Sequence, residues 1–223
     1  MDVFREGGVR SVGVIVAHPD DETLWAGGTM LMHRDRAWRV FALCRGSDPD
    51  RAPKFHRALA ALGATGAIAD LDDGPEQAPL DDEAVRAEVI RLVDGAAFDA
   101  LVTHGPRGEY TRHRRHEETH RAVAGLWCEG RIDAGELWVF AYDDDGRRAL
   151  PRAIPGAHAV VALSPEVWDE KYRVVTGIYG FGPDSWEART TPQDEAFWRF
   201  RTAGEYRRWI EKECQCDEGF GAL

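Results

Sequence analysis

The sequence predicts a three-layer α/β fold, in which a mostly parallel sheet carries helices on both of its faces. Two observations lead to this prediction. Short runs rich in valine, leucine and alanine alternate with segments whose apolar residues recur at helical spacing, a pattern typical of a doubly wound parallel sheet. The first of these runs, residues 12–17, is almost entirely apolar, as expected for a strand that is buried on both faces.

The other elements follow in alternating order. From their apolar runs, strands are predicted at residues 12–17, 38–43, 67–71, 98–103, 136–142 and 157–163. From the spacing of their apolar residues, helices are predicted at residues 21–34, 53–62, 81–93, a segment ending near 128, 165–175 and 193–211. Neither a repeat nor a linker interrupts this order. Residues 1–223 are therefore predicted to form one domain, with a C-terminal elaboration from about residue 165.

Charge and composition argue against two classes of partner. The chain carries a formal net charge of -11, which disfavours nucleic acid or an anionic membrane as its partner. No apolar run approaches the length of about 20 residues that spans a bilayer, and the first residues lack the apolar core of a signal peptide. We therefore expect a cytoplasmic protein, either a monomer or a homo-oligomer, that acts on a small molecule.

A polar cluster follows directly on the first predicted strand. The sequence there is His18-Pro19-Asp20-Asp21-Glu22, which places one imidazole and three carboxylates at the end of a buried strand. Such a cluster is costly to bury unless a cation is present. Histidine nitrogen and carboxylate oxygen together suit zinc or a similar divalent ion. In parallel α/β sheets, sites form beyond the carboxyl ends of the strands, which is where this cluster lies.

A second group of reactive residues follows the predicted strand at residues 98–103. His104 ends that strand, and His113, His116 and His120 lie at the start of the next predicted helix. Spacings of three and four residues put these rings on one helix face. Alone, a histidine-rich helix start is more often a solvated basic patch than a metal site. The cluster at the end of the first strand reverses that balance and favours a metal site.

With His18-Pro19-Asp20-Asp21-Glu22 after a buried strand and His-x-x-His near mid-chain, the sequence resembles the PIG-L/LmbE-like family of zinc-dependent N-deacetylases. The resemblance covers at least residues 9–128. It implies a Rossmann-like fold. It also implies hydrolytic removal of an acetyl group from a small N-acetylated sugar of the N-acetylglucosamine (GlcNAc) type.

The resemblance also implies roles for individual residues. His18, Asp21 and His116 match the zinc ligands of the family, Asp20 matches its general base, and His113 matches the histidine that stabilises the oxyanion or acts as an acid. Three protein ligands leave one coordination position for water, which is the arrangement of a catalytic zinc site. Fe²⁺ and other divalent ions bind the same donor set, so the sequence does not identify the metal.

One position departs from the family pattern. The family often has an aspartate directly before the second histidine, where this chain has Arg115, and a guanidinium cannot accept a hydrogen bond. We hypothesise that Glu109, Glu117 or Glu118 takes over the orientation of His113. If none of them does so, the pKa of His113 should be depressed.

Substrate contacts are expected from two loops at the same edge of the predicted sheet. One follows the second strand and the other precedes the histidine motif, and their candidate residues are Arg45, Ser47, Arg107, Glu109 and Tyr110. The glycine-rich segment at residues 177–186 is expected to form a flap on the substrate side.

Two other functions are compatible with the sequence. The first is an amidase that acts on a thiol-sugar conjugate, a reaction that the same family performs. The second is a catalytically inactive protein that binds metal or sugar, and Arg115 is the reason to consider it.

Overall fold

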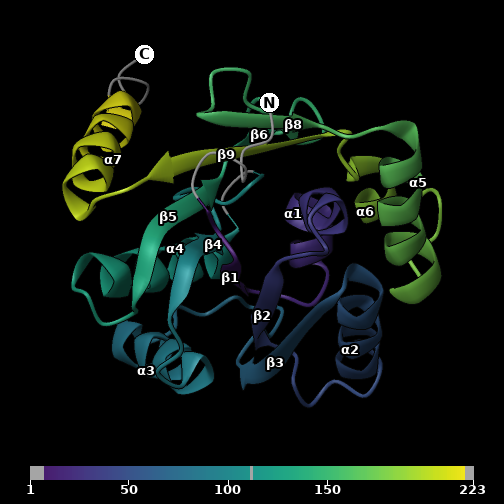
Figure 1. Cartoon of the computed structure of the whole chain (residues 1–223), viewed down its shortest axis with the longest axis horizontal. Coiled ribbons are helices and arrows are strands. Elements are labelled where there is room, and N and C mark those ends of the chain that lie inside the picture. Colours follow the sequence, from purple (N-terminus) through teal and green to yellow (C-terminus); the bar gives the residue numbers. More distant parts are fainter. Residues whose placement is uncertain (1–7, 111–112, 219–223) are drawn as a thin grey trace.

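The structure is a computed structural model that describes residues 8–110 and 113–218 (Figure 1). Its centre is a seven-stranded sheet with the strand order β3-β2-β1-β4-β5-β9-β8. The strands of this sheet are β1 (Ser11–Val16), β2 (Ala37–Cys44), β3 (Ala64–Leu71), β4 (Phe98–Thr103), β5 (Ala134–Phe140), β8 (Ala159–Ala162) and β9 (Asp194–Phe200). Two short strands, β6 (Tyr142–Asp143) and β7 (Arg152–Ala153), pair separately.

The sheet is mostly parallel, as the sequence predicted. β3, β2, β1, β4 and β5 run parallel to their neighbours, whereas β9 is antiparallel to both β5 and β8. β1 pairs with β2 on one side and with β4 on the other, so the loops that follow β1 and β4 start side by side.

Helices cover both faces of the sheet (Figure 1). One face carries α1 (Asp21–Met32), α2 (Arg51–Leu62), α5 (Pro165–Arg173) and the π-helical turn η1 (Val174–Ile178). The other face carries α3 (Asp82–Val93), α4 (Arg114–Cys128) and α7 (Ala203–Glu218). A short helix, α6 (Trp186–Thr190), follows η1.

Alternation along the strands divides the apolar core in two. Val14 of β1 packs in the cluster beneath α1 and α2, whereas the next residue, Ile15, packs in the cluster beneath α3 and α4. Both side chains are fully buried. Because each central strand is covered on both faces, its sequence reads as a continuous apolar run.

Local signals in the sequence set several helix ends. The side chain of Asp81 accepts a hydrogen bond from the backbone N–H of Ala84 (2.9 Å) and caps the start of α3. α2 ends at Gly63, whose φ of 74° is the left-handed conformation that glycine adopts readily.

The helix predicted at residues 193–211 is wrong in its first part, because residues 194–200 form strand β9 and α7 begins only at Ala203. Phe197 and Phe200 are three residues apart, a spacing that also fits one face of a helix. In the structure Phe197 packs in the core on the α1 side of the sheet and Phe200 in the core on the α4 side. A spacing of three residues puts two side chains on opposite faces of a strand, and both faces are apolar here.

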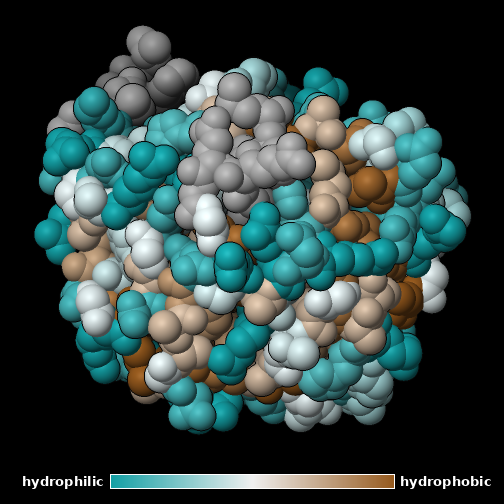
Figure 2. Space-filling model, viewed as in Figure 1, coloured by the Kyte–Doolittle hydropathy of each residue, from teal (hydrophilic) through white to brown (hydrophobic). Residues whose placement is uncertain are grey.

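The surface is largely polar. The face seen in Figure 2 carries mostly hydrophilic side chains, with smaller hydrophobic areas between them. Among the helices of the described residues, none is both long and apolar enough to span a bilayer.

A buried ion pair joins the C-terminal part of the chain to α1. The Nζ atom of Lys171 on α5 lies 2.7 Å from Oε1 of Glu195 on β9, and both side chains are fully buried. The same carboxylate accepts hydrogen bonds of 2.7 Å from the backbone N–H groups of Gly28 and Thr29 in α1. Elements from residue 165 onward therefore help to fix the helix that begins at Asp21.

Replacing Lys171 by methionine tests the importance of this pair. The variant leaves the buried Glu195 carboxylate without its counter-charge, so we expect the free energy of unfolding to fall by about 3 kcal/mol or more. Urea denaturation measures this change. Arg121→Met, which removes an exposed pair with Asp82, is the control and should cost less than about 1 kcal/mol. Equal losses in the two variants would contradict the prediction.

Candidate active site

The first half of the site comes from the carboxyl end of β1. The chain leaves this central strand in a tight loop, and Asp21 is the first residue of α1. The Oδ2 atom of Asp21 accepts a hydrogen bond from the backbone N–H of His18 (2.9 Å). This turn brings the ring of His18 beside the same carboxylate, with Nδ1 3.2 Å from Oδ2.

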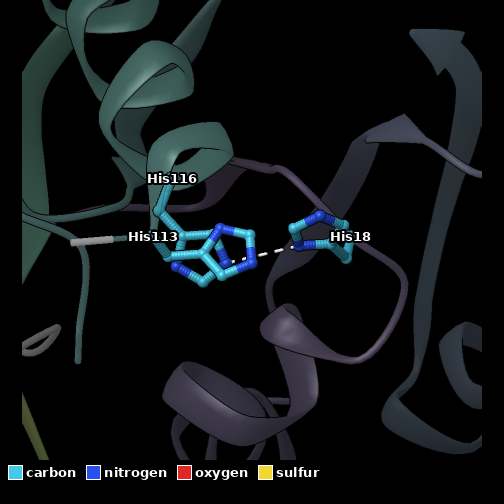
Figure 3. A group of neighbouring side chains, drawn as sticks. All are labelled: His18, His113 and His116. Atoms are coloured by element: carbon cyan, nitrogen blue, oxygen red, sulfur yellow. Dashed lines mark hydrogen bonds between the residues drawn. The ribbon is translucent and has the colours of Figure 1, made fainter. Parts of the chain in front are cut away.

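The second half comes from β4, the neighbour of β1, and from the start of α4. His104 directly follows β4, His113 is the N-cap residue of α4, and His116 lies in its first turn. Figure 3 shows the rings of His113 and His116 facing His18, which approaches from the loop after β1. The two clusters that the sequence placed at separate strand ends therefore meet.

Three potential ligand atoms lie at nearly equal distances from one another. Nδ1 of His18 is 3.2 Å from Oδ2 of Asp21, and Nε2 of His116 is 3.3 Å from each of those two atoms. Ligand atoms about 2.0–2.1 Å from a tetrahedral zinc ion lie about 3.3 Å apart. The three residues therefore fit the spacing of a tetrahedral metal site without rearrangement.

The charges at this point favour a cation. Burial acts to lower the pKa of His116, but Asp21 and then Glu109 raise it to about 10. Burial acts to raise the pKa of Asp21, yet His116 and His104 bring it well below its usual range. The buried carboxylate of Asp21 thus favours the protonated, positively charged form of His116 although burial opposes it. A divalent ion can take the place of that proton.

Carboxylates behind the two histidines fix which ring nitrogen is free. Oε2 of Glu109 lies 2.6 Å from Nδ1 of His116, and Oδ1 of Asp73 lies 3.2 Å from Nε2 of His18. Each carboxylate takes the ring N–H on the far side, so that the opposite nitrogen would present its lone pair to the shared point once a metal ion displaced the second proton. This arrangement, in which a carboxylate orients a metal-binding histidine, is common at zinc sites.

His104 is close to the ligand atoms but is engaged elsewhere. Its Nε2 atom accepts a hydrogen bond from the backbone N–H of Ala17 (2.9 Å), so its Nδ1 atom carries the proton and donates it to Glu109 (2.8 Å). Its ring stacks on that of His116, with centroids 3.9 Å apart. His104, Asp21 and His116 also form a group close enough to hold a metal, but the bond from Ala17 occupies the lone pair of His104.

Asp20 has an unusual backbone conformation, with φ 118° and ψ -30°. A non-glycine residue in this region is strained and needs support from its surroundings. The fully buried side chain of Glu22 provides it: its Oε2 atom accepts a hydrogen bond from the backbone N–H of Asp20 (3.0 Å). The hydroxyl groups of Thr23 and Tyr179 each donate to Oε1 of Glu22 at 2.6 Å.

The carboxylate of Asp20 lines the same cavity as these potential ligand atoms and forms an ion pair with an arginine. Nη1 of Arg51 lies 3.0 Å from Oδ2 of Asp20. Burial, and then the charge of Asp21, nevertheless raise the pKa of Asp20 well above its ordinary value. A carboxylate with a raised pKa can both accept and return a proton near neutral pH.

His113 lies beside the other two histidines, with its ring centroid 4.3 Å from that of His116 and 4.9 Å from that of His18. Its Nδ1 atom is buried and has no hydrogen-bond partner among the described residues. None of the three hypothesised glutamates therefore orients the ring through this nitrogen. Burial, followed by the nearby histidines, lowers the pKa of His113 to about 3. A depressed pKa is what we expect if no glutamate orients the ring.

Arg115 turns away from the cavity and holds the loop that follows β3. Its buried guanidinium donates to the backbone oxygens of Asp72 (2.7 Å) and Ala78 (2.9 Å) and to Oε2 of Glu118 (2.6 Å). The same loop carries Asp73, the carboxylate behind His18. Arg115 therefore has a structural role in this chain, because it supports the loop whose Asp73 contacts His18.

The five residues expected to contact substrate lie in different surroundings. Tyr110 borders the cavity over the ligand atoms, and Arg45 borders it too but is bound to Asp73 (Nη2–Oδ2 2.6 Å). Ser47 is hydrogen-bonded to Asp70, and Arg107 to the backbone oxygen of Glu213. Glu109 is fully buried behind His116, so its contacts are with the histidines.

The sequence analysis did not single out Asp73, nor the support of Asp20 by Glu22 and Tyr179. Asp73 follows the end of β3, at the same edge of the sheet as the two motifs. This position at the shared edge of the sheet was the one feature of the sequence that could have indicated a role for Asp73 in the site. Nothing in the sequence pairs Tyr179 with Glu22, because 157 residues separate them.

The cavity over the ligand atoms has a volume of about 240 Å³. Its far wall includes Trp186, from α6 and the end of the segment expected to form a flap, and Glu187. The ring of Trp186 lies 4.5 Å from that of Tyr110. Part of the expected flap therefore borders the cavity.

Fold and site together define an α/β protein with two histidines and one carboxylate converging at the carboxyl ends of its parallel strands. Residues 13–127 match the model of the PIG-L family, described as GlcNAc-PI de-N-acetylase. This segment is more than half of the chain, and the chain belongs to the PIG-L family. A comparison with curated proteins gave no match.

Several solved structures share the fold at low sequence identity. The N,N'-diacetylchitobiose deacetylase from Pyrococcus horikoshii has a TM-score of 0.67 at 15% identity, covering 90% of this chain and 86% of its own. A deacetylase of the teicoplanin biosynthetic pathway has a TM-score of 0.62 at 14% identity, covering 86% and 98%. GalB, the 4-carboxy-2-hydroxymuconate hydratase from Pseudomonas putida KT2440, has a TM-score of 0.63 at 16% identity, covering 85% and 95%.

The carboxylate behind His18 gives a test that needs no substrate. Asp73→Asn removes the negative charge that orients the His18 ring, so we expect the affinity for zinc to fall by about 10- to 100-fold. Competition with a chelating dye measures this affinity. The control is Asp70→Asn, three residues earlier, whose carboxylate is bound to Ser47 rather than to His18 and which should bind zinc as the wild type does. Unchanged affinity in Asp73→Asn would count against this geometry.

Proposed function

We propose that this chain is a zinc-dependent hydrolase that removes the acetyl group from a small N-acetylated sugar of the N-acetylglucosamine type. The observation that carries the proposal is the spacing of the ligand atoms of His18, Asp21 and His116. Membership of the PIG-L family supports the reaction. Two structural neighbours are named as deacetylases, and one of them is described in a zinc-inhibited form, so a protein of this fold can bind zinc.

In this proposal His18, Asp21 and His116 hold the metal. Zinc in such a site lowers the pKa of water to about 7 and polarises a carbonyl oxygen. Asp20 accepts the proton that water loses as it attacks the acetyl carbon. The strained backbone of Asp20, fixed through Glu22, keeps this carboxylate in place for the step.

The remaining steps need a hydrogen-bond donor and a proton. His113 is neutral, since its pKa is low, but a neutral imidazole still carries one N–H that can stabilise the oxygen as it gains negative charge. A neutral imidazole is a poor acid. The proton for the leaving amine therefore comes from Asp20, whose raised pKa lets it carry the proton from one step to the next.

Two variants separate metal binding from catalysis. Asp20→Asn should retain about one zinc per chain and lose acetate release from N-acetylglucosamine compounds by a factor of about 100 or more. His116→Ala should lose both zinc and acetate release. Metal analysis and an acetate assay on the same preparations measure the two effects.

The outcomes also distinguish the other functions. Zinc binding without acetate release, together with Asp20-dependent cleavage of a thiol-sugar amide, would replace the deacetylase with an amidase. Zinc binding with no turnover of either substrate would indicate a binding protein. If wild-type protein binds no zinc, the proposed mechanism fails.

The support of Asp20 gives a second test. Tyr179→Phe removes the hydroxyl that holds Glu22, so the Asp20 backbone loses part of its restraint. We expect kcat to fall by about tenfold, with zinc content unchanged, because misplacing a catalytic group lowers the rate of the chemical step. Steady-state kinetics measure this change. Tyr172→Phe, on α5, is the control and should leave kcat unaltered; matching losses in both variants would contradict a specific role for Tyr179.

A further inference from the structure

One buried histidine close to the site has no part in the proposed mechanism. His120 lies on α4, one turn after His116, and is 4% exposed. Its Nδ1 atom lies 2.7 Å from the backbone oxygen of His104, and its Nε2 atom lies 2.8 Å from the hydroxyl oxygen of Tyr206 on α7. The ring therefore joins the end of β4 to the C-terminal helix.

The two partners determine which nitrogen of His120 carries the proton. A carbonyl oxygen can only accept a hydrogen bond, so Nδ1 of His120 donates to His104. Burial lowers the pKa of His120 to about 4, although the bond to His104 acts to raise it. The ring is therefore neutral near neutral pH, and its Nε2 atom accepts a hydrogen bond from the hydroxyl group of Tyr206. The two bonds run in one direction, from α7 through α4 to the end of β4.

The backbone oxygen of His104 belongs to a peptide group that also supports the site. The N–H of this peptide, from Gly105, donates to Oε1 of Glu109 (2.9 Å), and the ring of His104 donates to Oε2 (2.8 Å). Within the described part of the chain, one further group donates to Glu109, namely Nδ1 of His116 (2.6 Å). The peptide held by His120 therefore sets the position of the carboxylate behind His116.

His104 is also bound to the other half of the site. Its Nε2 atom accepts a hydrogen bond from the backbone N–H of Ala17 (2.9 Å), and Ala17 directly precedes His18. His120 holds His104 by the backbone oxygen, which leaves both ring nitrogens of His104 for their contacts with Ala17 and Glu109. A displacement of His104 would therefore disturb both halves of the site.

Tyr206 is itself held by aromatic packing. It is 8% exposed, and its ring centroid lies 5.4 Å from that of Phe200 on β9 and 6.0 Å from that of Trp209 on α7. Buried tyrosines usually pair their hydroxyl group, and here a residue of α4 is a partner. Because the ring is packed on its sides, Tyr206 is a firm anchor for His120.

We propose that His120 and Tyr206 are positioning residues of the metal site. Tyr206 fixes the ring of His120, and His120 fixes the peptide that follows His104. That peptide in turn fixes Glu109, which orients His116. Both residues act through Glu109 rather than on the metal itself. This inference rests on the proposed function, because His116 is a ligand only if the site holds a metal.

Two variants of His120 separate positioning from simple packing. His120→Leu removes both hydrogen bonds, so we expect the affinity for zinc to fall by about tenfold, at the lower end of the range for residues that support a metal ligand. His120→Asn keeps an N–H close to the position of Nδ1 and should restore most of this affinity. Competition with a chelating dye measures the change.

Tyr206→Phe is a milder variant, because it removes one hydroxyl group and keeps the packed ring. We expect its zinc affinity to fall by about threefold, as the loss of one neutral hydrogen bond allows. The control is Trp127→Phe, also on α4, which loses an indole N–H bond to the backbone oxygen of Ala134 (2.9 Å). This variant should lower the free energy of unfolding, measured with urea, and leave the zinc affinity unchanged.

Proton NMR of the metal-free protein gives a readout that needs no zinc. The Nδ1–H group of His116, which is bonded to Glu109 at 2.6 Å, should give a downfield signal because the bond is short and charged. We expect this signal to persist in His120→Asn and in Trp127→Phe. It should shift or broaden in His120→Leu and in Tyr206→Phe.

The outcomes distinguish this inference from the proposed function. If the wild type binds no zinc but the signal of His116 changes as expected, the deacetylase mechanism fails and the positioning role stands. If His120→Leu and Tyr206→Phe lose stability but keep both the zinc affinity and the signal, the positioning role is overturned. Should His120→Leu fail to fold, an unchanged affinity and signal in Tyr206→Phe overturn it alone.

Discussion

The site depends on one constraint, the adjacency of β1 and β4 in a parallel sheet. Because the two strands are hydrogen-bonded neighbours that run in the same direction, the loops after them begin at the same edge. The loop after β1 and the first residue of α1 supply His18 and Asp21, and the first turn of α4 supplies His116. Their ligand atoms meet at 3.2–3.3 Å although 98 residues separate the two histidines. The other residues of the site either fix the positions of these atoms or lie beside them.

Support for the ligand atoms comes from several layers of the fold. Glu109 and Asp73 fix the two ring orientations, and Arg115 holds the loop that carries Asp73. From the opposite face, Tyr179 reaches Glu22 and thereby the backbone of Asp20. The C-terminal segment is therefore part of the site's architecture, since η1 and β9 fix the loop and helix that follow β1.

The sequence predicted the parts of the structure that depend on local pattern. The buried strand before His18, the alternation of strands and helices and the meeting of the two polar clusters all follow from apolar periodicity and parallel topology. It did not reveal what depends on contacts between distant segments. The spacing of Phe197 and Phe200 fits a helix as well as a strand that is apolar on both faces, and no pattern relates Tyr179 to Glu22. Arg115 appeared to be a defect in the site, whereas its side chain points into a neighbouring loop.

We propose that His18, Asp21 and His116 hold a single tetrahedral metal ion. Zinc K-edge X-ray absorption on zinc-loaded protein tests it most directly. We expect one zinc per chain with nitrogen and oxygen ligands only, at about 2.0–2.1 Å, two of them imidazoles. In His104→Ala the imidazole signal should be unchanged. A sulfur ligand, or loss of one imidazole in His104→Ala, would contradict the assignment.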